Sequence, residues 1–307
     1  MLKIENVHSF YGNIEALRGV TLDVAAGEVL GYLGPNGAGK TTTLKLLMQL
    51  IYPTSGSAEI LGRPVGDVGV RKRIGFLPEA PYFYDNLTAE ELLRYFASLF
   101  GFGAQDANRR TTELLDLVGL GAERRMVLRR YSKGMLQRVG IAQALINDPE
   151  VVFLDEPMSG LDPLGRRDVR TLILSLRDAG RTVLFSSHIL SDAEAVCSRV
   201  AIVSKGRLVA SGRIADLGLK VRGWELVVAG IEPSRVDALA PTVTSVTRVA
   251  DGRYVIELPV DRPPEHIVKE LAGSGARIIS LNPHHETLEE FFVAQVTQPD
   301  EDQRASV

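Results

Sequence analysis

Apolar and polar residues alternate in two short stretches near the N-terminus, at positions 2–7 and 19–24. A period of two indicates β-strands with one buried face, so an antiparallel β unit is predicted there. Three later stretches, at 27–33, 151–154 and 182–187, are mainly apolar without alternation. Such strands are typically buried on both faces of a parallel sheet. The chain is therefore expected to have an α/β fold with a mainly parallel core sheet.

Segments with helical periodicity separate these strands. Helices are expected at 43–50 and at about 165–179. The region 105–147 is expected to be helical apart from one break at 131–135. Helices that alternate with apolar strands are the usual way in which parallel strands are connected.

A capping box predicts the start of a further helix at Thr88. Its hydroxyl and the carboxylate of Glu91, three residues later, can each accept a hydrogen bond from the other residue's backbone N–H. The apolar face of this helix is expected to consist of Leu92, Leu93, Phe96, Leu99 and Phe100. Strands at 200–203 and 207–210 then predict a hairpin that closes the domain.

A glycine-rich loop lies between the apolar strand at 27–33 and the helix at 43–50. Glycines allow successive backbone N–H groups to surround phosphate oxygens, and the new helix adds the positive end of its dipole. Lys40 is expected to reach the β- and γ-phosphates, and the Thr41 hydroxyl to hold Mg²⁺. The predicted phosphate-binding loop (P-loop) consists of Gly34, Pro35, Asn36, Gly37, Ala38, Gly39, Lys40, Thr41 and Thr42.

Two carboxylates, Asp155 and Glu156, directly follow the apolar stretch at 151–154. This order predicts a buried parallel strand that ends at an active-site edge. Asp155 is expected to orient Mg²⁺, and Glu156 is expected to point at the attacking water. Two carboxylates next to a P-loop would repel the phosphates without a metal between them, so Mg²⁺ is implied.

Three further features are candidates for nucleotide contacts. Tyr11 is either a half-buried strand residue or an aromatic ring that stacks on the base, and the nearby P-loop favours stacking. Ser132 and Gly134 begin a helix and provide a second possible phosphate-binding end, although similar turns cap many helices. His188 ends the strand at 182–187, at the same expected edge, which favours a γ-phosphate contact over a structural role.

Composition narrows the class of protein. The 307 residues are 45% hydrophobic and 24% charged, as in globular proteins, and the formal charge of −3 gives no reason to expect a nucleic-acid partner. A single cysteine, Cys197, suits a reducing compartment. The start of the chain lacks the apolar stretch of a signal peptide, and no apolar run is long enough to span a membrane. We therefore expect a cytosolic protein.

The C-terminal part carries none of the nucleotide motifs. Its strands and helices are expected in the order strand, helix, strand, strand, helix, strand, which suggests a small ferredoxin-like α+β domain at 221–297. Within it, a short helix is expected at 234–239, paired strands at 243–249 and 254–258, and a last helix at 287–296. The polar tail at 298–307 is expected to be disordered.

Several of these motifs occur together in one order along the chain. They are the P-loop, the helix start with Ser132 and Gly134, the strand that ends in Asp155 and Glu156, the turn with Asp162, and His188. This set resembles the ATP-binding subunit of ATP-binding cassette (ABC) transporters over roughly residues 2–215, most of all the subgroup that works with separate membrane subunits of ABC-2 exporters. The resemblance implies a P-loop NTPase domain of ABC type at 1–217, with a helical subdomain at about 86–147.

The resemblance also implies a role for each matching residue. Two subunits would sandwich two ATP molecules, so that Ser132 and Gly134 of one copy touch the γ-phosphate bound to the other. Asp162 would link the two sites, and His188 would be the switch histidine. The remaining implied roles are adenine stacking for Tyr11, the Walker B carboxylate for Asp155 and the general base for Glu156.

The chain departs from the family pattern at two places. The usual Leu-Ser-Gly-Gly-Gln signature is replaced at 131–135, where Ser132 and the second glycine are kept and Lys133 adds a charge. Glu79 stands where the family usually has glutamine; it could still bind Mg²⁺ or water, but only as an acceptor. The aromatic cluster at 81–84 either docks the membrane subunit or packs within the helical subdomain.

The resemblance favours an ATPase subunit at the cytoplasmic face of the cell membrane. It would drive transport, with export favoured, through a separate permease of ABC-2 type. The alternative is a soluble ABC ATPase that remodels a ribosomal, DNA or protein complex, but such relatives generally carry tandem cassettes or a long coiled-coil insertion, which this chain lacks. A binding module without catalysis is disfavoured because every catalytic position is present.

Overall fold

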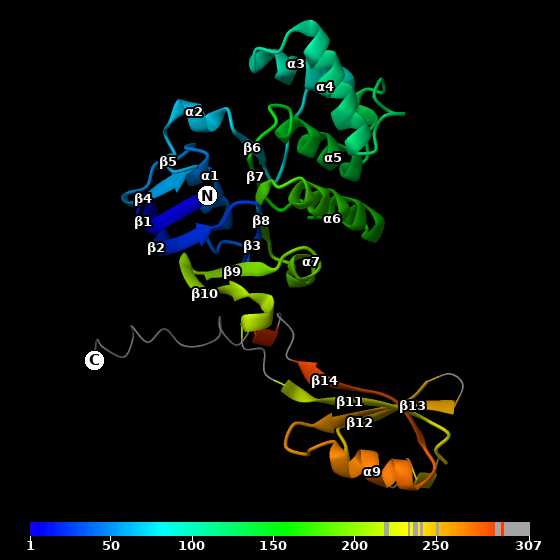
Figure 1. Cartoon of the computed structure of the whole chain (residues 1–307). Helices are drawn as coiled ribbons and strands as arrows, with labels where there is room; N and C mark the ends of the chain where they lie inside the picture. Colours follow the sequence, from blue (N-terminus) through cyan, green and yellow to red (C-terminus); the bar gives the residue numbers. More distant parts are fainter. Residues whose placement is uncertain are drawn as a thin grey trace, which may run out of the picture. The chain divides into compact units, whose positions relative to one another are not determined.

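The computed structural model describes residues 1–217, 221–232, 234–235, 239, 242–249, 252–285 and 290–291. The chain forms two compact units, of which the first holds Met1–Leu217 and the second lies within Gly218–Ala294. Figure 1 shows the first unit as a mixed α/β body and the second as a small sheet with a helix on one face.

An antiparallel sheet forms the N-terminal part of the first unit. Its order is β2-β1-β4-β5, and β1 pairs with both β2 and β4 along most of its length. Inward-facing residues such as Leu2 and Ile4 alternate with exposed ones, which confirms the predicted period of two. The strands are β1 (Leu2–Tyr11), β2 (Ile14–Val24), β4 (Ser55–Ile60) and β5 (Arg63–Pro64).

A six-stranded sheet forms the centre of the first unit, in the order β10-β9-β3-β8-β7-β6. All neighbouring strands are parallel except β9 and β10, which form the predicted hairpin. Because β3, β7 and β8 run side by side, their carboxyl ends meet at one edge, where ligands bind in open α/β sheets. The strands are β3 (Val29–Leu33), β6 (Ile74–Leu77), β7 (Val151–Leu154), β8 (Thr182–Ser187), β9 (Arg199–Ser204) and β10 (Arg207–Arg213).

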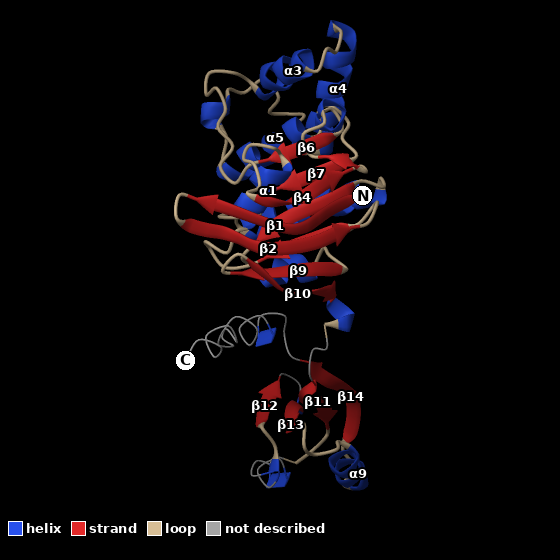
Figure 2. Ribbon diagram, turned by 90° about the vertical axis from the view of Figure 1, so that its left-hand side faces the viewer, coloured by secondary structure: helices blue, strands red, loops and turns tan. Residues whose placement is uncertain are grey.

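Helices cover both faces of the central sheet. Figure 1 shows α1 and the antiparallel sheet on one side, α6 and α7 on the other, and α3 and α4 beyond the β6 edge; Figure 2 shows the stacked sheets in a second view. One apolar core joins both sheets and α1. The helices are α1 (Lys40–Leu47), α2 (Val68–Arg71), α3 (Ala89–Leu99), α4 (Ala104–Leu117), η1 (Leu128–Arg130), α5 (Lys133–Ala144), α6 (Pro163–Asp178), α7 (Leu190–Glu194) and η2 (Ile214–Asp216).

Some helix boundaries differ from the sequence-based expectation. The first helix begins at Lys40 and not at residue 43, because Gly39, in a left-handed conformation, accepts a hydrogen bond from the Thr43 N–H at 2.9 Å. The segment 118–132, which was expected to be helical up to residue 130, contains no α-helix and one short 3₁₀ turn. The capping box of α3 is confirmed, but Leu99 and Phe100 of the expected apolar face are 63% and 42% exposed, and Ala97 is buried instead.

The second unit is an antiparallel sheet with an apolar core on one face. The strand order is β12-β13-β11-β14, and the expected α+β class is confirmed. The elements are β11 (Val221–Ala229), β12 (Ser245–Val249), β13 (Arg253–Pro259), α9 (Glu265–Gly273) and β14 (Arg277–His285). Part of the helix predicted at 234–239 lies outside the described residues, as does most of the helix predicted at 287–296. The predicted tail at 298–307 lies entirely outside them.

Candidate nucleotide-binding site

The P-loop follows β3 and turns sharply at its glycines. Gly37 and Gly39 have φ angles of 80° and 106°, which L side chains rarely adopt. A Cβ at Gly39 would lie 2.9 Å from the backbone oxygen of Ala16, and a Cβ at Gly34 would lie 2.4 Å from that of Val203. Larger residues would therefore push the loop away from β2 and β9 and open the backbone cradle.

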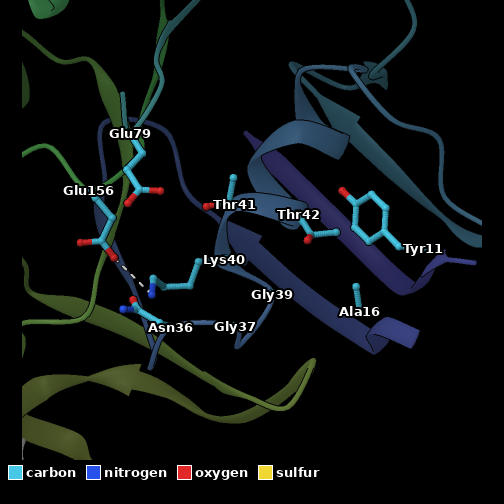
Figure 3. Close-up of a pocket in the computed structure, with 10 residues that line it drawn as sticks. All are labelled: Tyr11, Ala16, Asn36, Gly37, Gly39, Lys40, Thr41, Thr42, Glu79 and Glu156. Carbon is cyan, nitrogen blue, oxygen red and sulfur yellow. Dashed lines mark ion pairs between the residues drawn. The ribbon is translucent and has the colours of Figure 1, made fainter. Parts of the chain in front are cut away.

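Lys40, at the first position of α1, is buried within this loop, with only 6% of its surface exposed. Its ammonium donates to the backbone oxygens of Gly34 at 2.7 Å and Pro35 at 3.2 Å. It also lies 3.2 Å from Oε1 of Glu156, the ion pair drawn as a dashed line in Figure 3. That oxygen receives no well-aligned hydrogen bond, so the pair is held by charge more than by directional bonding.

A buried tyrosine supports the helix behind the loop. The Tyr32 hydroxyl on β3 lies 3.0 Å from the Thr43 hydroxyl, which itself donates to the Gly39 oxygen at 3.1 Å. Burial raises the pKa of Tyr32 to about 12, so this hydroxyl stays protonated across the physiological range. The interaction fixes α1 against the central sheet.

One serine on β8 contacts both acidic residues that follow β7. The Ser186 hydroxyl donates to Oδ1 of Asp155 at 2.6 Å and accepts the Glu156 backbone N–H at 2.8 Å. Asp155 is almost fully buried. Because β7 and β8 are neighbours in the sheet, these two bonds fix the conformation of the chain directly after β7.

Glu156 has a left-handed backbone with φ of 49°, which is uncommon for a residue with a side chain. Such strain is often found at functional sites, where the surrounding contacts maintain it. Its Oε2 lies 2.8 Å from Nδ1 of His188, and its Oε1 faces Lys40. The Glu156 carboxylate thus lies between a cation and an imidazole at the edge where β3, β7 and β8 end.

Lys40 and Glu156 line a cavity of about 280 Å³. Figure 3 shows Glu79 and Glu156 on one side of it and the Tyr11 ring on the other, with the P-loop and the start of α1 between them. Tyr11 is 47% exposed, so one face of its ring is available. The lining residues are Tyr11, Ala16, Asn36, Gly37, Gly39, Lys40, Thr41, Thr42, Glu79 and Glu156.

Comparison with known proteins identifies the family. The family model described as ABC transporter matches residues 17–159. An ABC transporter ATP-binding protein of Synechocystis sp. is 46% identical over 287 residues, which are 93% of this chain and 79% of the relative. The chain belongs to the ATP-binding proteins of ABC transporters. A bacitracin transport ATP-binding protein of Enterococcus faecalis is 34% identical, over 95% of each chain.

Solved structures agree with this assignment. An ATP-binding subunit of an ABC transporter has 33% identity and a TM-score of 0.64, over 71% of this chain and 92% of that one. A dimeric ATP-binding cassette in a post-hydrolysis state, bound to ADP and Pi, has 26% identity and a TM-score of 0.64, over 70% of this chain and 99% of that one. The expected ABC-type fold is confirmed, and the chain is an ABC ATPase that binds ATP.

Ser132, Gly134 and Asp162 lie at helix starts that do not line the cavity of this ABC subunit. Ser132 is exposed and caps α5, accepting the Met135 N–H at 3.2 Å. Gly134 is in the first turn of the same helix, and Asp162 caps α6 by accepting the Gly165 N–H at 2.9 Å. None of the three lines the cavity. The structure brings Tyr11, the P-loop, Glu79 and Glu156 together around the cavity. His188 is connected to this group by its contact with the Glu156 carboxylate.

Sequence reasoning missed two residues of the ABC site. The sequence pattern places Ser186 only within a strand, although its position, two residues before His188, is a signal for a side chain at the active edge. Ala16 lines the cavity through its place on β2, next to the P-loop, and no sequence signal marks it. A small residue there leaves room beside the Tyr11 ring.

The chemistry of the site fits a nucleoside triphosphate. The P-loop glycines that admit no Cβ form a backbone cradle, and Lys40 adds a buried positive charge. Glu156 Oε1 is buried without an aligned donor, and a water molecule could supply one. Thr41, Glu79 and Asp155 offer the oxygen ligands that Mg²⁺ prefers.

Proposed function

We propose that this ABC ATPase works as a pair of copies that enclose two ATP molecules and drive export through a separate membrane permease. The observation that carries the proposal is the division of the site within one chain. Tyr11, Lys40 and Glu156 line one cavity, whereas Ser132 and Asp162 are exposed caps of α5 and α6 and are not part of its lining. A second copy that offers its own Ser132 and Gly134 would complete each cavity.

In this proposal hydrolysis is an in-line attack of water on the γ-phosphate. Glu156 takes the proton of the attacking water. His188, whose Nδ1 lies 2.8 Å from the Glu156 carboxylate, orients that carboxylate and contacts the γ-phosphate. Lys40 stabilises the charge that develops on the phosphate oxygens. The P-loop residues from Gly34 to Thr42 orient the phosphates, and the Tyr11 ring stacks on the adenine.

Mg²⁺ belongs to the same proposal. Thr41 and Asp155 would hold it, with Glu79 as a further acceptor close to Thr41 and Glu156 (Figure 3). When bound, the ion neutralises phosphate charge and orients the β- and γ-oxygens. The Ser186 hydroxyl, which donates to Asp155, then leaves the second oxygen of that carboxylate free to act as an acceptor.

The permease partner is supported by an apolar groove in the first unit. It has a volume of about 330 Å³ and lies between the end of α1, β6, α3 and α5, with Met48, Phe76 and Phe100 among its lining. Tyr82 is 93% exposed, whereas its neighbour Phe83 is 8% exposed. Of the two roles considered for the cluster at 81–84, Phe83 therefore packs inside and Tyr82 would meet the permease.

Export is supported by the names of relatives. Besides the bacitracin transport protein, a daunorubicin resistance ATP-binding protein of Streptomyces coeruleorubidus is 35% identical over 95% of this chain and 94% of the relative. In the described part of the chain, no helix combines the length and the apolar character that crossing a membrane requires. The proposed permease is a separate chain of ABC-2 type, with this subunit at the cytoplasmic face of the membrane.

Affinity purification tests this function. A tagged Glu156→Gln chain is expressed in its native host and purified in mild detergent with ATP and Mg²⁺, and a Lys40→Ala chain is the matched control. Recovery of a polytopic membrane protein in a two-plus-two ratio with the Glu156→Gln chain, and less with the control, is the expected result. Recovery of ribosomes or soluble complexes without a membrane protein would contradict the transport function and favour the remodelling alternative.

A further inference from the structure

Arg170 on α6 and Asp192 on α7 form an ion pair in the first unit. The Arg170 Nη2 donates to Asp192 Oδ1 at 2.5 Å, and Asp192 is 0% exposed. The second Asp192 oxygen and the Arg170 Nε are buried without a hydrogen-bond partner in the described part of the chain. A carboxylate without water needs a compensating cation, and Arg170 supplies it.

Each of the two helices starts at a loop of the proposed site. Asp162 caps α6, so Arg170 lies two helical turns after this aspartate. The α7 helix begins at Leu190, two residues after His188, and the Ile189 N–H between them donates to the Ser187 hydroxyl at 2.9 Å. A displacement of either helix is therefore passed directly to the loop at its N-terminus.

The α7 helix is packed tightly onto the central sheet. A Cβ at Gly31 of β3 would lie 3.2 Å from Cβ of Ala193 and 3.2 Å from Sγ of Cys197, so the helix has no space to move inward. Its other neighbour is α6, which lies on the same side of the sheet (Figure 1). Close packing on one side and an ion pair on the other make the position of α7 depend on the position of α6.

We propose that the Arg170–Asp192 pair couples the Asp162 turn to His188, and so sets how His188 contacts Glu156. Neither residue lines the nucleotide cavity, so both are positioning residues. The inference rests on the proposed function in one respect, because contact of a second copy with Asp162 would be the event that moves α6. Through the pair, that event reaches the 2.8 Å contact between His188 and Glu156.

The test is a double-mutant cycle on ATP hydrolysis by the purified full-length chain with Mg²⁺. The variants are Arg170→Gln, Asp192→Asn and their double, with Arg170→Lys as the conservative variant. Arg167→Gln is the matched control, because Arg167 is on the same helix with 72% of its side chain exposed. The kcat and KM for ATP are measured for each, together with the melting temperature.

The proposal predicts a tenfold or larger fall in kcat for each of the two single variants, with KM within twofold of the original chain. The double variant falls no further than the worse single one, Arg170→Lys recovers most of the activity, and Arg167→Gln stays within twofold. Folded variants that keep kcat within twofold, whatever their melting temperature, would overturn it, as would additive losses in the double variant. Since Asp192→Asn removes the buried charge itself, it keeps the test decisive if Arg170→Gln does not fold. The comparison needs no permease, so its failure is distinct from failure of the transport function.

Discussion

The Lys40 ammonium lies 3.2 Å from the carboxylate of Glu156, and both side chains are almost fully buried. The cation that the P-loop offers to phosphate is thus shared with the carboxylate proposed to activate water. A γ-phosphate bound by Lys40 competes with Glu156 for the same charge. Phosphate binding would weaken the hold of Lys40 on Glu156 and leave this carboxylate to the attacking water and His188.

Loss of the Lys40 charge is expected to abolish tight ATP binding. Charge-assisted hydrogen bonds contribute about 1.5–3 kcal/mol each, so Lys40→Ala should weaken ATP binding by about 10²-fold or more. The measurement is a titration with a fluorescent ATP analogue. Lys45→Ala, an exposed lysine on the same helix, is the control and should bind normally. Binding by Lys40→Ala within threefold of the control would contradict the role of Lys40.

The Tyr11 ring is expected to contribute through its face and not through its hydroxyl. Base–aromatic stacking is worth about 1–3 kcal/mol, so Tyr11→Ala should weaken ATP binding by roughly 5- to 150-fold. Tyr11→Phe should bind within twofold of the original chain. Calorimetric titration measures both, and equal losses in the two variants would exclude stacking.

Ser186→Ala is expected to disturb both carboxylates at once. It removes the donor to Asp155 and the acceptor of the Glu156 N–H, and each lost bond at a buried group costs about 1–3 kcal/mol. We expect kcat to fall by at least tenfold and the Mg²⁺ concentration for half-maximal rate to rise. Hydrolysis at the original rate and Mg²⁺ dependence would mean that the strand alone orients Asp155 and Glu156.

The sequence predicted the site wherever contacts are local. The P-loop is a continuous segment, and the α3 capping box needs only Thr88 and Glu91, so short-range spacing was sufficient. Ser186 could not be assigned in this way, because its role comes from the β7–β8 register, which pairs residues 31 positions apart. The prediction that Leu99 lies on the buried face of α3 was also wrong. Helical periodicity does not reveal where α4 and α5 stop covering α3.

Cys197 is expected to be unreactive in the folded chain. Burial raises the pKa of its thiol far above the usual range, and only the thiolate reacts readily. At pH 8 the native chain should therefore show almost no labelling by a thiol reagent, with full labelling of the sole cysteine after unfolding. The rate of labelling with and without denaturant measures this, and rapid labelling of the native chain would show that α7 opens.

Hydrolysis by Glu156→Gln tests the central claim most directly. Glutamine keeps the size of the side chain but cannot accept a proton from water, so kcat should fall by about 10²–10⁴-fold. Glu113→Gln, an exposed carboxylate on α4, is the matched control. ATP binding should be retained, because Lys40 is then freed from its ion pair.

Phosphate release and ATP binding are measured on the same preparations of Glu156→Gln and of the control. Retained binding with phosphate release reduced by at least 10²-fold is the predicted result. Phosphate release at a rate near that of the control would contradict the assignment of Glu156 as the general base.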